Sequence, residues 1–275
     1  MRFMGRNLMR ITGALLALSA MTGCAGYPTP TAGAMPSDQI AVMVMSSGGM
    51  IPPVVAVMQS PSLVVYGDGR VLSKVPAPAL QLVPARYEIS DIGPGPVAAF
   101  VSKVRSGGLV SAATDFGSPP ITDVDTTTVL VNGDGGPSEV RVYAFDERFE
   151  QDLTPAQREA RSRLRTLIAE AGELAAGKPQ TLYVPDRVTV SEPMSGRNQE
   201  PASTPWPGPP PSAFLIPTRK GRAVACGELV GAEARTVYLA ALDNTGARWL
   251  VDGDTRVLGV NPVPLPGACP WTTPR

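Results

Sequence analysis

The sequence predicts an α+β fold in which antiparallel β-hairpins pack against two or three helices, and its two halves could form separate subdomains. Short β-branched runs flank turns rich in glycine and aspartate at three places, which is the pattern of β-hairpins. Other segments carry apolar residues at the spacing of a helix face. Hairpins and helices follow one another in blocks, so we expect antiparallel sheet.

The first strand is predicted over residues 40–46, where β-branched residues alternate with others. Two glycines and two prolines then end it. Residues 62–75 form a hairpin about Gly67-Asp68-Gly69, because these residues tolerate the positive φ of a tight turn. A further strand is expected over 82–90, with Pro84 indicating an edge or a bulge.

Two helices are predicted next, with a second hairpin about residues 133–136 between them. The first helix runs from Pro96 to Arg105 and ends at two glycines. The second runs from Pro155 to about Ala176, with Thr154 as its cap, and ends at a glycine. Gln157 stands three residues after Thr154 and completes a capping box.

The remaining third of the chain mixes strands with a proline-rich stretch. Residues 181–190 are predicted as one strand. Residues 192–211 hold too many prolines for a packed element and are interpreted as a polyproline-II linker or a long surface loop. The elements expected after it are strands at 214–216 and 222–230, a helix at 232–242 and a hairpin about Asp252-Gly253-Asp254.

The beginning of the chain has the pattern of a secretory signal peptide. Arg2, Arg6 and Arg10 precede an apolar run from Ile11 to Met21, and no acidic residue interrupts it. This run is far shorter than the roughly 20 residues that a membrane-spanning helix needs. The sequence therefore predicts export and removal of the segment.

Residues 21–24, Met-Thr-Gly-Cys, resemble the bacterial lipoprotein box, although Met21 replaces the usual leucine. The resemblance implies that Cys24 is acylated with diacylglycerol and becomes the first mature residue. Such an anchor holds a protein at the membrane because each buried methylene contributes about 0.8 kcal/mol. We expect a cell-membrane, lipid-anchored protein on the extracytoplasmic face; the alternative is a plain secreted protein.

These patterns divide the chain into five parts. They are a signal peptide (1–23), a flexible tether (24–37), an α+β domain (38–191), a proline-rich linker or loop (192–211) and a smaller α+β subdomain (212–275). Removal of residues 1–23 takes away three arginines and leaves 21 basic and 24 acidic residues. A net charge of −3 provides no basic field for nucleic acid.

Cysteine and histidine usage limits the chemistry. Cys226 and Cys269 remain after Cys24, and in an oxidising compartment such a pair forms a disulfide; the alternative is two buried thiols. The chain contains no histidine, which excludes Ser-His-Asp and Cys-His systems and histidine-based zinc sites. We expect no cofactor and no metal.

Two stretches resemble a family of unknown function. "SLVVYGDGRVL", followed by "ITDVDTTTVLV", resembles a domain of unknown function in secreted bacterial proteins and actinobacterial, mycobacterial-type lipoproteins. The tail from "CGELVGAEARTVYLAAL" to the final "GAC" is similar to the end of such lipoproteins, which implies pairing of Cys226 with Cys269. The arginine-rich, alanine-rich composition also suits a GC-rich genome. The resemblance implies no catalytic residue.

The candidate sites are few. Asp123 and Asp125, with Asp115 nearby, could work as acid and base or bind calcium, since alternate residues of a strand share a face; loop acids are the simpler explanation. Trp206 could bind a partner or pack on its own domain. Four arginines make a basic helix face that we expect to be solvated: Arg158, Arg161, Arg163 and Arg165.

The sequence thus favours a non-enzymatic envelope lipoprotein that binds a protein or wall component. Two alternatives remain. One is a carboxylate-dependent envelope hydrolase that uses Asp123 and Asp125. The other is a small-ligand or lipid carrier, which requires an apolar cavity between sheet and helix.

Overall fold

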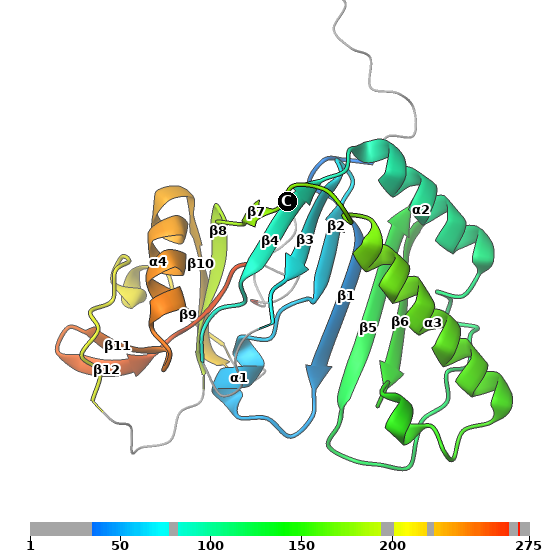
Figure 1. Ribbon diagram of the computed structural model, residues 1–275. Coiled ribbons are helices and arrows are strands. Elements are labelled where there is room, and N and C mark those ends of the chain that lie inside the picture. The colour runs from blue at the N-terminus through cyan, green and yellow to red at the C-terminus, as the bar shows by residue number, and fades with distance from the viewer. Residues whose placement is uncertain (1–34, 77–81, 194–200, 219–222, 264–268, 270–275) are drawn as a thin grey trace, which may run out of the picture. The chain divides into compact units, whose positions relative to one another are not determined.

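The computed structural model describes residues 35–76, 82–193, 201–218, 223–263 and 269. Over these residues the chain is an α+β protein with antiparallel sheets of seven, four and two strands and four α-helices (Figure 1). The predicted fold class is confirmed. Residues 1–34, which include the predicted signal peptide and most of the tether, lie outside the described part.

The larger sheet has the strand order β6-β5-β1-β2-β3-β4-β7. Its strands are β1 (Ile40–Gly48), β2 (Leu63–Tyr66), β3 (Arg70–Lys74), β4 (Tyr87–Asp91), β5 (Asp125–Gly133), β6 (Gly136–Tyr143) and β7 (Thr181–Leu182). The first strand lies near the middle, because β1 pairs with β2 on one side and with β5 on the other. It thereby joins the two hairpins that the sequence predicts separately.

Helices α2 (Pro94–Gly107) and α3 (Pro155–Glu173) cover one face of this sheet (Figure 1). Valines of β1, β5 and β6 point to this face and pack against the apolar stripe of each helix. Their burial removes apolar surface from water, which is the main stabilising contribution to such a layer. The shared core includes Val42, Val129, Val140, Phe100, Val101, Leu164 and Leu167.

Both helices begin and end close to where the sequence places them. The Thr154 hydroxyl accepts a hydrogen bond from the Gln157 backbone N–H, and the Gln157 side chain accepts one from the Thr154 N–H, so the predicted capping box is confirmed. Gly108, whose φ of 66° is left-handed, is the C-cap of α2. α3 ends at Glu173, slightly earlier than predicted.

The smaller sheet has the order β13-β8-β10-β9. Its strands are β8 (Arg187–Pro193), β9 (Ile216–Pro217), β10 (Ala223–Val230) and β13 (Gly259–Asn261). Helix α4 (Gly231–Asp243) packs on it, and the hairpin of β11 (Arg248–Val251) and β12 (Asp254–Val257) adds Trp249 to the core. The predicted helix and the hairpin about residues 252–254 are confirmed.

A short helix that the sequence reasoning missed, α1 (Pro53–Val57), lies against β8 and β13. The approach is close enough that a Cβ on Gly259 would lie 2.9 Å from the Met58 side chain and 3.0 Å from that of Val57. Glycine is therefore required at this position of β13. Pro53 takes the first helical position of α1, and Pro52 is its N-cap.

Two predicted segments need correction. Residues 181–190 are not one strand: residues 183–186, which include Pro185, separate β7 of the larger sheet from β8 of the smaller one. Proline lacks the N–H that a continuous ladder requires. The strand predicted over 82–90 covers only Tyr87–Asp91. For residues 201–211 the loop alternative applies, because they pack on the C-terminal core through Trp206.

The described residues of both sheets belong to one compact unit. The Tyr238 hydroxyl on α4 donates a hydrogen bond to the Ala85 carbonyl (3.2 Å), and the Ser60 hydroxyl donates one to Asn261 of β13 (3.0 Å). β8, which the predicted first domain includes, pairs with two strands of the predicted second domain. The exact domain limits stay a prediction.

Candidate functional site

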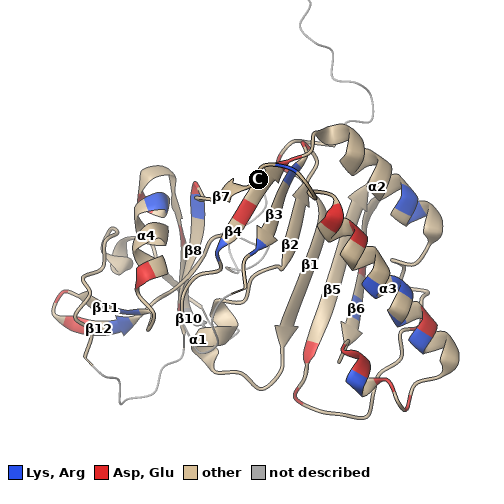
Figure 2. Cartoon of the chain, in the orientation of Figure 1, with Lys and Arg blue, Asp and Glu red and all other residues tan. Residues whose placement is uncertain are grey.

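Charged side chains gather where β6 leads into α3, whereas the strands of the larger sheet carry few of them (Figure 2). A surface hollow of about 600 Å³ lies here, which we call the acidic hollow. The start of β5 supplies Asp125 and Thr127, and α3 supplies Arg165. The turn after β6 and the short 3₁₀ segment that follows supply Phe145, Asp146, Glu147 and Arg148.

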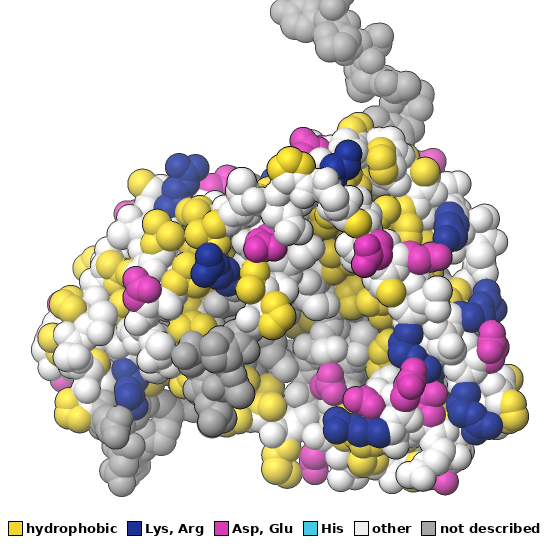
Figure 3. All heavy atoms as spheres, in the orientation of Figure 1, with side chains coloured by type: hydrophobic (Ala, Val, Ile, Leu, Met, Phe, Trp, Pro, Cys, Tyr) yellow, Lys and Arg dark blue, Asp and Glu magenta, His cyan; other side chains and the backbone are white. Residues whose placement is uncertain are grey.

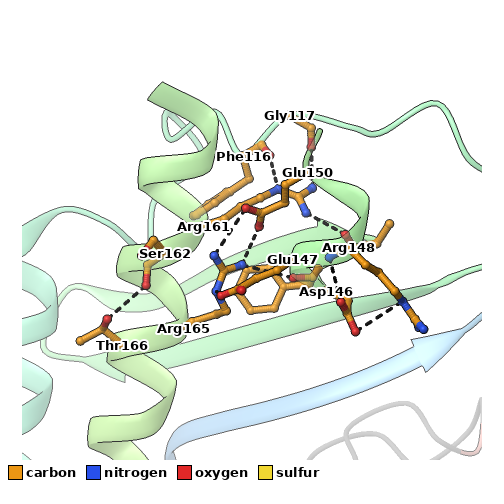
Figure 4. Close-up of polar contacts among 12 residues, drawn as sticks. Phe116, Gly117, Asp146, Glu147, Arg148, Glu150, Arg161, Ser162, Arg165 and Thr166 are labelled. Carbon is orange, nitrogen blue, oxygen red and sulfur yellow. Dashed lines mark hydrogen bonds and ion pairs between the residues drawn. The ribbon is translucent and has the colours of Figure 1, made fainter. Parts of the chain in front are cut away.

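Arg165, which lines the acidic hollow, is held by the carboxylates of Glu147 and Glu150 (Figure 4). Its Nη1 lies 2.5 Å from Glu150 Oε1, and its Nε lies 3.1 Å from Glu147 Oε1. The guanidinium also lies 5.6 Å from the centre of the Phe145 ring. Since its charge is already matched, Arg165 does not make the acidic hollow an anion-binding site.

Arg161, one turn earlier on α3, is completely buried and acts as a polar clamp. It donates hydrogen bonds to the carbonyl oxygens of Phe116 (2.7 Å), Gly117 (3.3 Å), Tyr143 (2.8 Å) and Ala144 (2.7 Å). Burial lowers its pKa from the usual value, although Glu150 opposes this effect. One side chain thereby fixes the end of β6 against the segment before β5.

The expected solvated arginine face of α3 is therefore wrong for two of its four members. Arg161 is buried and Arg165 is ion-paired, whereas Arg163 is exposed. Helical spacing alone cannot distinguish a guanidinium that faces carbonyl groups from one that faces water. Figure 3 shows the acidic and basic side chains of this region side by side on the surface.

The structure separates the two candidate carboxylates by backbone conformation. Asp123 lies in the turn before β5 with a left-handed φ of 63°, and its carbonyl accepts a hydrogen bond from Met50 N–H. Asp125 is the first residue of β5, opposite Gly48, and lines the acidic hollow. Asp123 lies outside the strand, so the argument that alternate strand residues share a face does not apply to this pair.

Asp115, the third acidic residue of this group, has a structural role. It accepts hydrogen bonds from the Gly117 N–H (2.8 Å) and from Gln157 Nε2 (2.9 Å), and these bonds lower its pKa. It thus connects the loop before β5 to the start of α3. Within the described ranges, no group of three or more His, Cys, Asp or Glu residues is placed to hold a metal ion.

A second surface feature, which we call the α2 groove, was missed by the sequence reasoning. It has a volume of about 580 Å³ and runs beside α2, between the helix and the turns of the two hairpins. Met35, Val97 and Val101 supply apolar surface. The polar groups along it belong to Gln39, Ser102, Arg105, Ser106 and Asp134.

Arg105 fixes one wall of the α2 groove. Its Nη1 donates a hydrogen bond of 2.7 Å to the Gly136 carbonyl, across the turn between β5 and β6. A Cβ on Gly133 would lie 2.7 Å from Arg105 Cδ and 3.1 Å from the Val101 side chain, so this packing favours glycine at that position. The sequence marks these glycines as a turn, but it does not show that the turn meets α2.

The remaining candidates, Trp206 and the cysteine pair, lie near the smaller sheet. Trp206 packs on its own domain, edge-on to Trp249 at 5.1 Å and stacked with Phe214 at 6.5 Å between ring centres. Its backbone N–H donates to the Leu250 carbonyl, and its indole N–H donates to that of Pro209. Residues 192–211 had two interpretations, a linker and a loop, and their described part is a packed loop. A disulfide joins Cys226 and Cys269 in the core.

These arrangements support binding better than catalysis. The α2 groove combines apolar side chains with a polar rim, which suits an amphipathic segment or a small ligand. No helix within the described ranges is both long and apolar enough to span a membrane. No family model, no curated protein and no solved structure matches the chain.

Proposed function

We propose that the chain is an extracytoplasmic lipoprotein, anchored through Cys24, that acts as a non-enzymatic binding module in the cell envelope. The basic start, the short apolar run and Cys24 in its lipobox-like setting support the anchor. The Cys226–Cys269 disulfide is consistent with an oxidising compartment. The observation that best supports a binding role is the α2 groove.

The groove also lies within reach of the proposed anchor. Met35, which lines it, is eleven residues after Cys24. A fully extended chain covers at most about 3.6 Å per residue, so the anchor and Met35 would be no more than about 40 Å apart. A ligand of the α2 groove would therefore be met close to the membrane surface, as expected for an envelope protein or wall component.

The occupant should present an apolar group beside Val97 and Val101 and hydrogen-bonding groups to Ser102, Ser106 and Gln39. Arg105 and Asp134 add one charge of each sign, so neither a strongly anionic nor a strongly cationic ligand is favoured. This chemistry suits an amphipathic peptide segment.

A matched pair of substitutions tests the groove. Ala98 and Ala99 are both exposed on α2, but only Ala98 lines the groove. A photo-crosslinking residue at Ser106 should give a discrete adduct in living cells. Ala98→Trp should remove this adduct by filling the groove, and Ala99→Trp should leave it. Equal adducts in both variants would contradict the proposed binding site.

The anchor has its own test. Mass spectrometry of the intact protein from its native membrane should show an acylated chain that starts at Cys24. Its mass should be lower by two hydrogens because of the disulfide. Cys24→Ala should release the protein from the membrane fraction. An unacylated chain that stays in the membrane would overturn the proposed location.

The carboxylate-dependent hydrolase remains an alternative with a separate test. Asp125 is the candidate acid that lines the acidic hollow, since Asp123 is not among the lining residues. Loss of a wall-degrading activity in Asp125→Asn, with the groove adduct unchanged, would favour the hydrolase over the binding module.

A further inference from the structure

Strand β6 forms one edge of the larger sheet and is paired on one side only, with β5 (Figure 1). The edge at the other end, β7, has two residues, whereas β6 has eight. A long edge strand presents unpaired N–H and C=O groups that can pair with another strand. The groups that β6 presents therefore decide what can pair with it.

The hydrogen-bond pattern shows which residues of β6 point outward. The Ala144 N–H donates to the Asp125 carbonyl, so Ala144 and Asp125 are a hydrogen-bonded pair. In an antiparallel ladder such pairs alternate, so Val142, Val140 and Ser138 bond to β5. Pro137, Glu139, Arg141 and Tyr143 consequently direct their backbone groups away from it.

One of these outward groups already has a partner. The Tyr143 carbonyl accepts a hydrogen bond from Arg161, so this end of the outward edge is already occupied. Glu139 and Arg141 make no outward backbone bond to any described residue. Both are exposed, as is Pro137, which lacks an N–H.

Antiparallel self-pairing with Val140 opposite Val140 of a second copy places Glu139 opposite the partner copy's Arg141, and Arg141 opposite its Glu139. Both pairs then join opposite charges on the sheet face away from α2 and α3, because Val140 and Val142 face the helices. Each directly opposed pair of this kind exchanges two backbone hydrogen bonds, which gives four in total.

The neighbouring registers are disfavoured by charge. A shift by one ladder step in one direction sets Glu139 against Glu139, and a shift in the other sets Arg141 against Arg141. Like charges directly opposite each other destabilise a strand pair. Pro137 and the charged side chains would likewise hinder pairing with an apolar strand. The edge is therefore complementary to itself in one register.

We propose that two copies of this protein associate through β6, in antiparallel register centred on Val140, to extend the larger sheet across the dimer. A lipid anchor at Cys24 would confine both copies to one membrane and raise their effective concentration. The contact uses neither the α2 groove nor the anchor chemistry itself, so it stands independently of the proposed function.

Sedimentation velocity of the complete mature protein in detergent tests the proposal with two charge reversals. The wild type should dimerise. In Glu139→Arg, arginine faces arginine at both pairs, and in Arg141→Glu, glutamate faces glutamate. Each variant should therefore weaken self-association by at least about tenfold. Mixed together, the two variants should form a heterodimer, because every opposed pair is again of opposite sign.

The double reversal, Glu139→Arg with Arg141→Glu, should restore self-association. Arg235→Glu, on the exposed side of α4, is the matched control and should dimerise like the wild type. A monomeric wild type, or single variants that self-associate as well as the wild type, would overturn the proposal. Circular dichroism of each variant shows that a loss of the dimer is not a loss of the fold.

Discussion

The larger and the smaller sheet differ in the sequence separation of the strands that pair in them. Most pairings of the larger sheet join strands close in sequence, such as β2 with β3, β3 with β4 and β5 with β6, although β1 with β5 and β4 with β7 join distant ones. In the smaller sheet distant pairings predominate, because β8 pairs with β10 and β13, whose residues come 30–43 and 68–72 positions later by their register. Local pairing can be recognised from a sequence, whereas distant pairing requires the fold.

The two regions also stabilise their irregular segments differently. Near the larger sheet, the buried Arg161 holds loop and strand together through four carbonyl groups. Near the smaller sheet, the packed aromatic rings of Trp206, Trp249 and Phe214 and a disulfide do so. The first region thus relies on a polar clamp and the second on apolar contacts and a covalent bond.

The largest effect is expected from Arg161→Leu. Loss of the guanidinium leaves four carbonyl groups without this donor, so we expect unfolding free energy to fall by about 3–5 kcal/mol. Urea unfolding followed by circular dichroism measures the loss. Arg163→Leu, on the exposed side of the same helix, is the control and should change stability by about 0.5 kcal/mol or less.

The same experiment shows whether the regions unfold together. All three tryptophans, Trp206, Trp249 and Trp271, come after residue 200, so tryptophan fluorescence reports on the C-terminal part. Tyr238 and Asn261 join that part to the region of the larger sheet. We expect both signals to shift in Arg161→Leu; a fluorescence transition that stays unchanged would show two independent units.

The sequence predicted what local chemistry determines. The hairpins about residues 67–69, 133–136 and 252–254 follow from glycine and aspartate in turns, and α3 follows from Thr154 and Gln157. The central place of β1 and the division of residues 181–190 between two sheets depend on distant partners. The α2 groove also depends on distant partners, because it forms where Arg105 of α2 meets the turn of the β5–β6 hairpin.

Loss of the disulfide should have the next largest effect, and it sharpens the contrast between the regions. Cys226→Ala with Cys269→Ala opens a loop of 43 residues, which should cost about 3–4 kcal/mol on the chain-entropy account. Calorimetry and tryptophan fluorescence measure the loss. Reduction of the wild type should give a similar shift, and a variant as stable as the oxidised wild type would contradict a stabilising role for the bond.

The smallest loss of stability is expected from a change at Trp206, which tests whether the proline-rich segment packs on the core of the smaller sheet. Trp206→Ala removes a partly buried ring that contacts Trp249 and Phe214, so we expect a loss of about 2 kcal/mol, below the value for a fully buried tryptophan. Trp206→Phe should lose less, because it keeps an aromatic ring and gives up only the indole bond to Pro209. Thermal unfolding separates the variants. Equal stability of Trp206→Ala and wild type would make residues 201–211 a linker after all, since a packed loop must contribute to the core that it covers.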